Sequence, residues 1–254
     1  MGALTVLCSI GTTHPWNIAG LGLDARVAQH LEARHVAVVA GVSAQGGGEA
    51  RAFPVDAQLL AAQLRAAAAA KPDAYRIGAL LAAESVAVVA DAFAHVSVPI
   101  VCDPVIATSD GARLADDATV AALRVKLFPR CALVTPNLAE ATVLCGFPVN
   151  DTATMAGAAH TLVTRDGARA AVVTGGHLAN EATDVLYASG ATTTLRDTLL
   201  PGGMRGTGCV LASATAIYLA RGENVVDAIT AARALVRDAI AHSAQWNGER
   251  VWPW

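Results

Sequence analysis

The sequence predicts an α/β fold in which a mostly parallel central sheet is covered by helices on both faces. Short runs rich in Val, Ile and Leu alternate with longer, alanine-rich amphipathic segments. The short runs are nearly continuous in apolar residues, which is typical of strands buried on both faces. A single domain is expected over residues 1–254, because a chain of this length can bury one large core and no stretch has the composition of a linker.

The expected elements alternate along most of the chain. Strands are predicted at residues 4–10, 36–42, 74–78, 99–103, 131–135 and 169–174. Helices are predicted at residues 20–32, 56–70, 81–95, 117–127, 138–146 and 152–165. Residues 183–196 predict a hairpin, because Ser189-Gly190 separates two β-rich runs, and the last 45 residues predict two helices.

Composition and charge argue against several classes of protein. The net charge is −3 with no basic block, so we expect neither nucleic acid nor an anionic lipid surface as a partner. The apolar runs are far shorter than the roughly 20 residues that span a bilayer. The chain lacks a charged leader, and its five cysteines form no C-x-x-C pair, so we expect a cytoplasmic protein that acts on small molecules.

The segment Gly206-Thr207-Gly208-Cys209 precedes an apolar helical run and has the composition of an anion-binding loop. Glycines allow successive backbone N–H groups to point at one spot, and the start of the helix adds its partial positive charge there. The alternative is an ordinary helix start in which Thr207 is the cap and Cys209 fills a small core space.

Other polar residues follow the predicted strands, at the sheet edge where parallel α/β proteins bind ligands. Asp103-Pro104-Val105 follows the strand at 99–103, and Pro136 to Glu140 follows the strand at 131–135. Gly175-Gly176-His177 and the run Ser43 to Gly48 follow two further strands. The carboxylates of Asp103 and Glu140 could hold magnesium directly or through water. Alternatively, Asp103 only precedes a turn and Glu140 lies on a solvated first helical turn.

Of two common nucleotide-binding loops, one is excluded and the other is disfavoured. The two lysines, Lys71 and Lys126, do not follow a glycine loop, so no P-loop is present. Gly20 to Ala25 matches G-x-G-x-x-A but begins about ten residues after the first strand, too far for the tight turn of a dinucleotide fold. Any bound phosphate must therefore be held mainly by backbone amides.

Four ordered segments resemble the ribokinase-like superfamily: Asp103-Pro104-Val105, Thr135 to Ala141, Gly175-Gly176-His177 and Gly206 to Cys209. From about residue 4 to residue 240 the chain resembles hydroxymethylpyrimidine/phosphomethylpyrimidine kinases of thiamine biosynthesis. Cys209 narrows the resemblance to these pyrimidine kinases and some pyridoxal kinases, because most ribokinase-like enzymes have aspartate at this position. The resemblance implies a three-layer α/β/α sandwich, ATP and Mg2+ as cofactors, and a homodimer.

The resemblance also implies roles for individual residues. Backbone amides of Gly206, Thr207 and Gly208 would hold the γ-phosphate, and Cys209 would lie beside the acceptor hydroxyl. A helix N-terminus is expected to lower the pKa of that thiol from about 8.5. The nucleotide and its magnesium ion would be held by Asn137, Glu140, Thr174, Gly176 and Asp103.

For the pyrimidine, the resemblance implies contacts with Ala19, Asp24, Gln45 and Val105. The Gln45 amide both donates and accepts, which suits an aminopyrimidine edge. The alternatives are that Gln45 is a polar loop residue and that Asp24 is an acid complementing the start of a helix.

The chain departs from the family in the loop Thr13 to Ile18, where Trp16 and Ile18 add bulk to a span in which the family's glycines would leave room, and at Thr174, where the family has lysine. Kinase chemistry is therefore expected, with hydroxymethylpyrimidine and its monophosphate as acceptors. A kinase of pyridoxal, pyridoxine or another heterocyclic alcohol is the second hypothesis. A pyrimidine-binding protein without turnover is the third.

Overall fold

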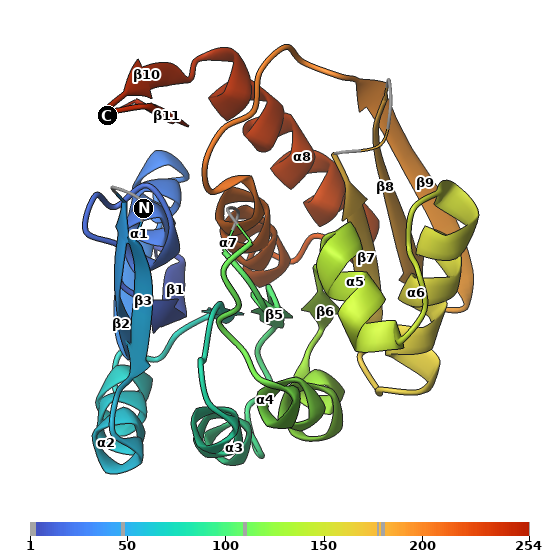
Figure 1. Cartoon of the computed structure of the whole chain (residues 1–254). Helices are drawn as coiled ribbons and strands as arrows, with labels where there is room; N and C mark the ends of the chain where they lie inside the picture. Colours follow the sequence, from blue (N-terminus) through green and yellow to red (C-terminus); the bar gives the residue numbers. More distant parts are fainter. Residues whose placement is uncertain (1–3, 47–48, 109–110, 177, 179–180, 254) are drawn as a thin grey trace.

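The computed structural model describes residues 4–46, 49–108, 111–176, 178 and 181–253. It confirms the predicted α/β architecture: a nine-stranded sheet lies between two layers of helices (Figure 1). The strand order is β3-β2-β1-β4-β5-β6-β7-β8-β9. The six neighbouring strands from β2 to β7 are parallel, and β3, β8 and β9 are antiparallel to their neighbours.

The six predicted parallel strands all form, with boundaries shifted by a few residues. The sheet consists of β1 (Val6–Thr12), β2 (Arg34–Gly46), β3 (Glu49–Pro54), β4 (Ala74–Ile77), β5 (Ile100–Cys102), β6 (Leu133–Val134), β7 (Ala170–Gly175), β8 (Glu181–Ala188) and β9 (Ala191–Thr198). The predicted hairpin is β8–β9, and its turn places Ser189 and Gly190 at positive φ, which suits the right-handed twist of the strands.

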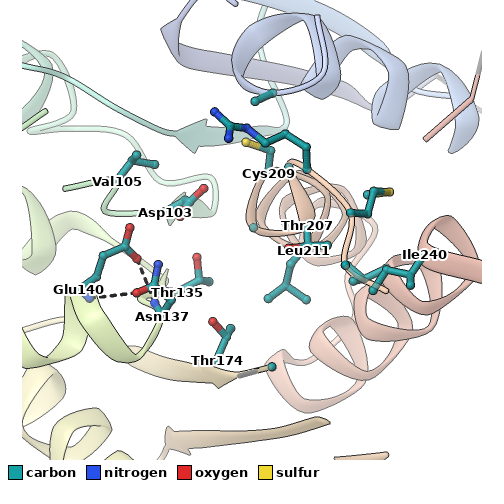
Figure 2. A pocket seen from close by; sticks show the side chains of 18 of the residues that line it. Asp103, Val105, Thr135, Asn137, Glu140, Thr174, Thr207, Cys209, Leu211 and Ile240 are labelled. Carbon is teal, nitrogen blue, oxygen red and sulfur yellow. Dashed lines mark hydrogen bonds between the residues drawn. The ribbon is translucent and has the colours of Figure 1, made fainter. Parts of the chain in front are cut away.

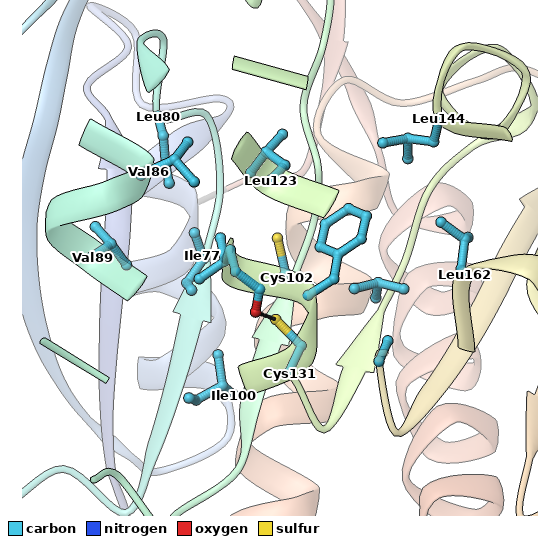
Figure 3. Close-up of a cluster of buried hydrophobic side chains, with 14 of the residues drawn as sticks. Ile77, Leu80, Val86, Val89, Ile100, Cys102, Leu123, Cys131, Leu144 and Leu162 are labelled. Atoms are coloured by element: carbon cyan, nitrogen blue, oxygen red, sulfur yellow. Dashed lines mark hydrogen bonds between the residues drawn. The ribbon is translucent and has the colours of Figure 1, made fainter. Parts of the chain in front are cut away.

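Helices cover both faces of the sheet. One layer consists of α1 (Gly20–His30), α7 (Thr207–Ala220) and α8 (Val225–Ala241). The other layer consists of α2 (Ala57–Ala68), α3 (Ala83–Ala92), α4 (Asp117–Ala122), α5 (Leu138–Cys145) and α6 (Thr152–Thr164). Alternate strand residues face alternate layers, as the pleat requires: Leu7 packs with α1 and α7, whereas Cys8 packs with α2 and α3. Figure 3 shows part of the core between the sheet and the layer of α2 to α6, where Ile77, Ile100 and Cys102 from neighbouring strands meet Val86, Val89 and Leu123.

Two parts of the chain differ from the prediction. The run Ser43 to Gly48 was expected to follow the second strand, but β2 continues through Gly46 and pairs with β3 as an antiparallel extension of the sheet edge. After α8, a second small hairpin forms from β10 (Ala244–Trp246) and β11 (Glu249–Val251). Among the described residues, no helix is long and apolar enough to cross a membrane.

Candidate active site

A cavity of about 470 Å³ opens where the parallel strands end (Figure 2). It extends from the start of α1 and the end of β1, past the end of β5 and the start of α5, to the β7–β8 edge and α8. Eleven of the predicted site residues line it: Ala19, Asp103, Val105, Asn137, Glu140, Thr174, Gly176, Gly206, Thr207, Gly208 and Cys209. The motifs that lie far apart in the sequence are therefore brought to one cavity.

The loop at the start of α7 has the backbone of an anion-binding site. Gly206 is the N-cap at φ +85°, and the first helical hydrogen bond runs from Val210 N–H to its carbonyl oxygen. The amides of Thr207 to Cys209 thus have no acceptor within the helix. A Cβ on Gly206 would lie 2.6 Å from the Ile18 carbonyl oxygen and against Leu23. Both the positive φ and this close packing require glycine at 206.

Asp103 lies beside this helix start. A Cβ on Gly208 would lie 3.5 Å from Asp103 Oδ2, so the carboxylate is in contact with the first turn of α7. The side chain is buried, and Arg76 Nη2 donates to Oδ2 over 2.6 Å. Burial raises the pKa of Asp103, although the charge of Arg76 opposes the rise. Asp103 is therefore not the solvated turn residue of the alternative interpretation.

Glu140 caps its own helix and faces Asp103 across the cavity (Figure 2). Asn137 and Glu140 form a capping box: Glu140 N–H donates to Asn137 Oδ1 over 3.0 Å, and Asn137 N–H donates to Glu140 Oε2 over 2.9 Å. Glu140 is only 6% exposed, so it is not on a solvated turn either. Burial, together with the charge of Asp103, raises its pKa to about 8. Two buried carboxylates that oppose each other's ionisation suit a cation between them.

The expectation for the Cys209 thiol is wrong. Cys209 lies on the first turn of α7 as predicted, but burial raises the pKa of its thiol to about 11. The nearby charge of Arg76 lowers that pKa, whereas Asp24 and Asp103 raise it. Desolvation and two carboxylates therefore outweigh the helix terminus, and the group is a thiol at neutral pH.

The expectation for Asp24 is also wrong. Asp24 lies on α1, and its side chain is fully buried. The carboxylate accepts from Ser213 Oγ over 2.9 Å and from Arg76 Nη1 over 3.1 Å. It is not among the residues that line the cavity, and its two oxygens are occupied by Ser213 and Arg76. It is not in the first turn of α1 either, so it does not complement the start of that helix. The side chain of Gln45 and the residue His177 lie outside what the structure describes.

Arg76 is the site residue that the sequence analysis missed. It lies in β4, is 1% exposed, lines the cavity and forms ion pairs with both Asp24 and Asp103. A charged residue in an otherwise apolar strand, between Tyr75 and Ile77, was the available signal.

The far end of the cavity combines apolar and cationic side chains. Leu211 of α7 points into it opposite Thr174 (Figure 2), and Leu199, Leu200, Val236 and Ile240 also line it. Arg233 lines this end and forms ion pairs with Asp184 and Asp197, while Asp184 accepts from Gly175 N–H over 2.9 Å. Arg237 also lines this end and forms an ion pair with Asp197, so the two arginines are balanced by two aspartates.

The bulky residues of the loop Thr13 to Ile18 do not fill the cavity. Ile18 is buried, and neither it nor Trp16 is among the residues that line the cavity. The Trp16 ring packs against Trp246 of the C-terminal hairpin in a T-shaped pair with centroids 5.3 Å apart. The altered loop therefore contacts β10, and its two bulky side chains leave the cavity open.

Comparison with known proteins agrees with this geometry. The sequence profile of the family described as Phosphomethylpyrimidine kinase matches residues 16–253. A hydroxymethylpyrimidine/phosphomethylpyrimidine kinase of Rhizobium meliloti is 36% identical over 236 residues, which cover 88% of this chain and 85% of the relative. The enzyme of the same name from Streptomyces coelicolor is 34% identical over 87% of this chain and 83% of its own.

Solved structures share the whole fold. An ADP complex of Bacillus subtilis pyridoxal kinase superposes with a TM-score of 0.90 at 26% identity, covering 98% of this chain and 97% of the other. A phosphomethylpyrimidine kinase from Clostridium difficile has a TM-score of 0.81 at 21% identity, over 93% and 99% of the two chains. With an anion-binding loop, two opposed carboxylates and a profile match over nearly its whole length, this chain belongs to the phosphomethylpyrimidine kinase family, whose members are ATP-dependent phosphotransferases.

Proposed function

We propose that this protein transfers the γ-phosphoryl group of ATP to the hydroxymethyl group of 4-amino-5-hydroxymethyl-2-methylpyrimidine, and then phosphorylates the monophosphate. The observation that carries the proposal is the juxtaposition of the anion-binding loop Gly206 to Cys209 with the buried carboxylates of Asp103 and Glu140 in one cavity. Phosphoryl transfer requires positioning and charge stabilisation more than covalent help from the protein, and this arrangement supplies both.

The start of α7 is the centre of the proposed mechanism. The amides of Thr207, Gly208 and Cys209 would donate to the γ-phosphate oxygens as negative charge builds on them. Ala19 and Val105, which line the cavity, would border the acceptor, and its hydroxyl would lie beside Cys209. Because Cys209 is a thiol at neutral pH, its role in the ground state is to orient the acceptor hydroxyl by hydrogen bonding, and it is not the base.

Asp103 and Glu140 fit a magnesium ion. Mg²⁺ is commonly held by one or two carboxylates together with water and substrate phosphates, and a cation would relieve the repulsion that raises the pKa of Glu140. Among the described residues no group of three or more ligand side chains is present, which agrees with a metal site completed by the nucleotide. When bound, the ion would neutralise phosphate charge during transfer.

The apolar end of the cavity suits the adenine ring. Leu211, Val236 and Ile240 offer an apolar surface, and Thr174 and Gly176 border the path toward the phosphates. Arg233 and Arg237 lie at this end, paired with Asp184 and Asp197, and would offer N–H donors to a nucleotide.

The test is a coupled ATP-consumption assay across vitamin precursors, with mono- and diphosphate products resolved by mass. We expect the pyrimidine to give both products. A Cys209→Ala variant should phosphorylate the pyrimidine more slowly, and an unchanged rate would contradict the role given to the thiol. Calorimetric binding of the pyrimidine without ADP formation would instead identify a binding protein that lacks turnover.

A kinase of pyridoxal is the second candidate. The observation that favours it is the TM-score of 0.90 to the Bacillus subtilis pyridoxal kinase, together with an acceptor space that Trp16 and Ile18 leave open. Initial rates on pyridoxal and on the pyrimidine, measured at matched concentrations, distinguish the two functions.

We also propose a homodimer in the cytoplasm. Val42 and Phe53 are paired across β2 and β3 and are 50% and 64% exposed, so the sheet edge carries an apolar pair that a second copy would cover. None of the five cysteines forms a disulfide, which suits a reducing compartment. Light scattering of the wild type and of Phe53→Asp tests the dimer, and a monomeric wild type would contradict it.

A further inference from the structure

Arg76 occupies an interior position that an apolar residue would ordinarily fill. In β4, Ala74 packs on the layer of α1 and α7, and Tyr75 and Ile77 pack on the opposite layer. The pleat therefore turns Arg76 toward α1 and α7. Burying a guanidinium has a large desolvation cost that paired carboxylates offset only in part. Its Nε is also buried and has no hydrogen-bond partner among the described residues, which adds to that cost.

One guanidinium connects three elements of the site. Nη1 donates to Asp24 of α1 over 3.1 Å, and Nη2 donates to Asp103 after β5 over 2.6 Å. The same guanidinium is close enough to Cys209 of α7 for its charge to lower the pKa of the thiol. These contacts join segments that are 27 to 133 residues from Arg76 in the sequence, at positions 24, 103 and 209.

The three connected elements belong to different sides of the reaction. Ala19 and Gly20, at the start of α1, line the acceptor side of the cavity, and Asp24 is one turn further along the same helix. Asp103 lies against Gly208, on the phosphate side. Cys209 lies between them. A displacement of Arg76 would therefore change the separation of the acceptor wall from the phosphate-binding loop.

We propose that Arg76 is a positioning residue for phosphoryl transfer: its guanidinium holds α1, Asp103 and Cys209 in one arrangement, so that the acceptor hydroxyl and the γ-phosphate meet in line. This inference rests on the proposed function. When the arrangement loosens, water takes the place of the acceptor. The bond between the γ-phosphorus and its bridging oxygen then breaks as a bond to a water oxygen forms, and the products are ADP and inorganic phosphate.

The test measures ADP and phosphorylated acceptor separately in Arg76→Met and Arg76→Lys. Product is counted as phosphoryl groups transferred, so that a diphosphate counts twice, and the wild type should then give about one ADP per group, as any coupled kinase does. In Arg76→Met we expect the rate of acceptor phosphorylation to fall about 100-fold, because misplacement by about 1 Å has an effect of that size. The ratio of ADP to product should rise well above one, while KM for ATP stays within about threefold, since Arg76 does not touch the apolar end of the cavity. Arg76→Lys keeps the charge but not the fork of donors, so it should recover only part of the coupling.

A control is Arg124→Met, which removes a partly buried ion pair in which Arg124 Nη2 lies 3.2 Å from Asp166 Oδ1; Arg124 does not line the cavity. It should lower stability without changing the ratio of ADP to product. If Arg76→Met keeps a ratio of one and loses no more rate than Arg124→Met, the positioning role is wrong. If Arg76→Met does not fold, Arg76→Lys decides, and wild-type rate and ratio in that variant would overturn the proposal. A wild type that phosphorylates no acceptor would overturn the proposed function itself before any variant is made.

Discussion

The phosphate side and the acceptor side of the cavity are built from different kinds of contact. On the phosphate side, the Gly206 turn and the Asn137–Glu140 capping box are made by residues within four positions of each other. On the acceptor side, Asp24 bonds to Ser213, 189 residues away, and the Trp16 ring packs against Trp246. The turn and the capping box on the phosphate side are formed by neighbouring residues, whereas the acceptor wall depends on contacts between distant segments. Substitutions on the two sides should therefore differ in how strongly they affect the reaction rate and the stability of the protein.

The largest effect is expected at Gly206. Alanine at 206 would strain the positive φ and clash with the Ile18 carbonyl oxygen, so the loop must move and acceptor phosphorylation should fall by about 100-fold or more. Gly222→Ala is the matched control, because Gly222 is also at positive φ, +92°, but has no atom within 4 Å of an added Cβ. The control should lose about 1–3 kcal/mol of stability through strain and keep its rate. Equal activities of the two variants would show that the loop's exact position does not matter.

The next effect concerns Glu140 and pH. Its folded-state pKa of about 8 lies above the ordinary value of 4.5, so the native state holds this proton more tightly than the unfolded chain. Its contribution to stability is full below about pH 4.5 and is lost as the pH rises toward 8. Urea denaturation of metal-free wild type should therefore show falling stability across this range, by a few kcal/mol at most from this group. Glu140→Gln should flatten the fall. An unchanged slope would mean that Glu140 is ionised throughout.

A smaller effect is expected at Cys209, the thiol between the two sides. Because its pKa is about 11, alkylation at pH 7 should be slow and should rise about tenfold per pH unit up to that value. Mass spectrometry of iodoacetamide-treated protein locates the modification, and the other four cysteines are buried. Rapid alkylation of Cys209 at pH 7 would instead indicate a thiolate, which could accept the proton of the acceptor hydroxyl during transfer.

The smallest effect is expected for the aromatic pair. Trp16→Ala and Trp246→Ala should show a coupling of about 0.5–1.5 kcal/mol in a double-mutant cycle of stability. Because neither ring lines the cavity, kcat/KM for the acceptor should stay within about threefold. A large rise in KM would place the rings at the acceptor after all.

The same contrast explains what could be predicted from the sequence. All six parallel strands, the β8–β9 hairpin and both helices α7 and α8 follow from periodicity and turn residues, and the strand-end motifs located the cavity. The continuation of β2 into β3 was missed because the glycine-rich run 46–48 resembles a loop. Asp24 and Cys209 were misjudged because burial and neighbouring charge, which no local pattern encodes, decide their roles. Arg76 was overlooked because its three partners come from distant segments.

The Glu140 carboxylate has two functions at once, since it caps α5 and faces the proposed metal site. The Asn137 amide that it accepts from is consequently a natural probe for hydrogen exchange. A proton or a cation that changes the charge or position of that carboxylate also changes the protection of the Asn137 N–H from hydrogen exchange. Deuterium uptake at Asn137 can thus report the occupancy of the phosphate side, without an attached probe and without turnover.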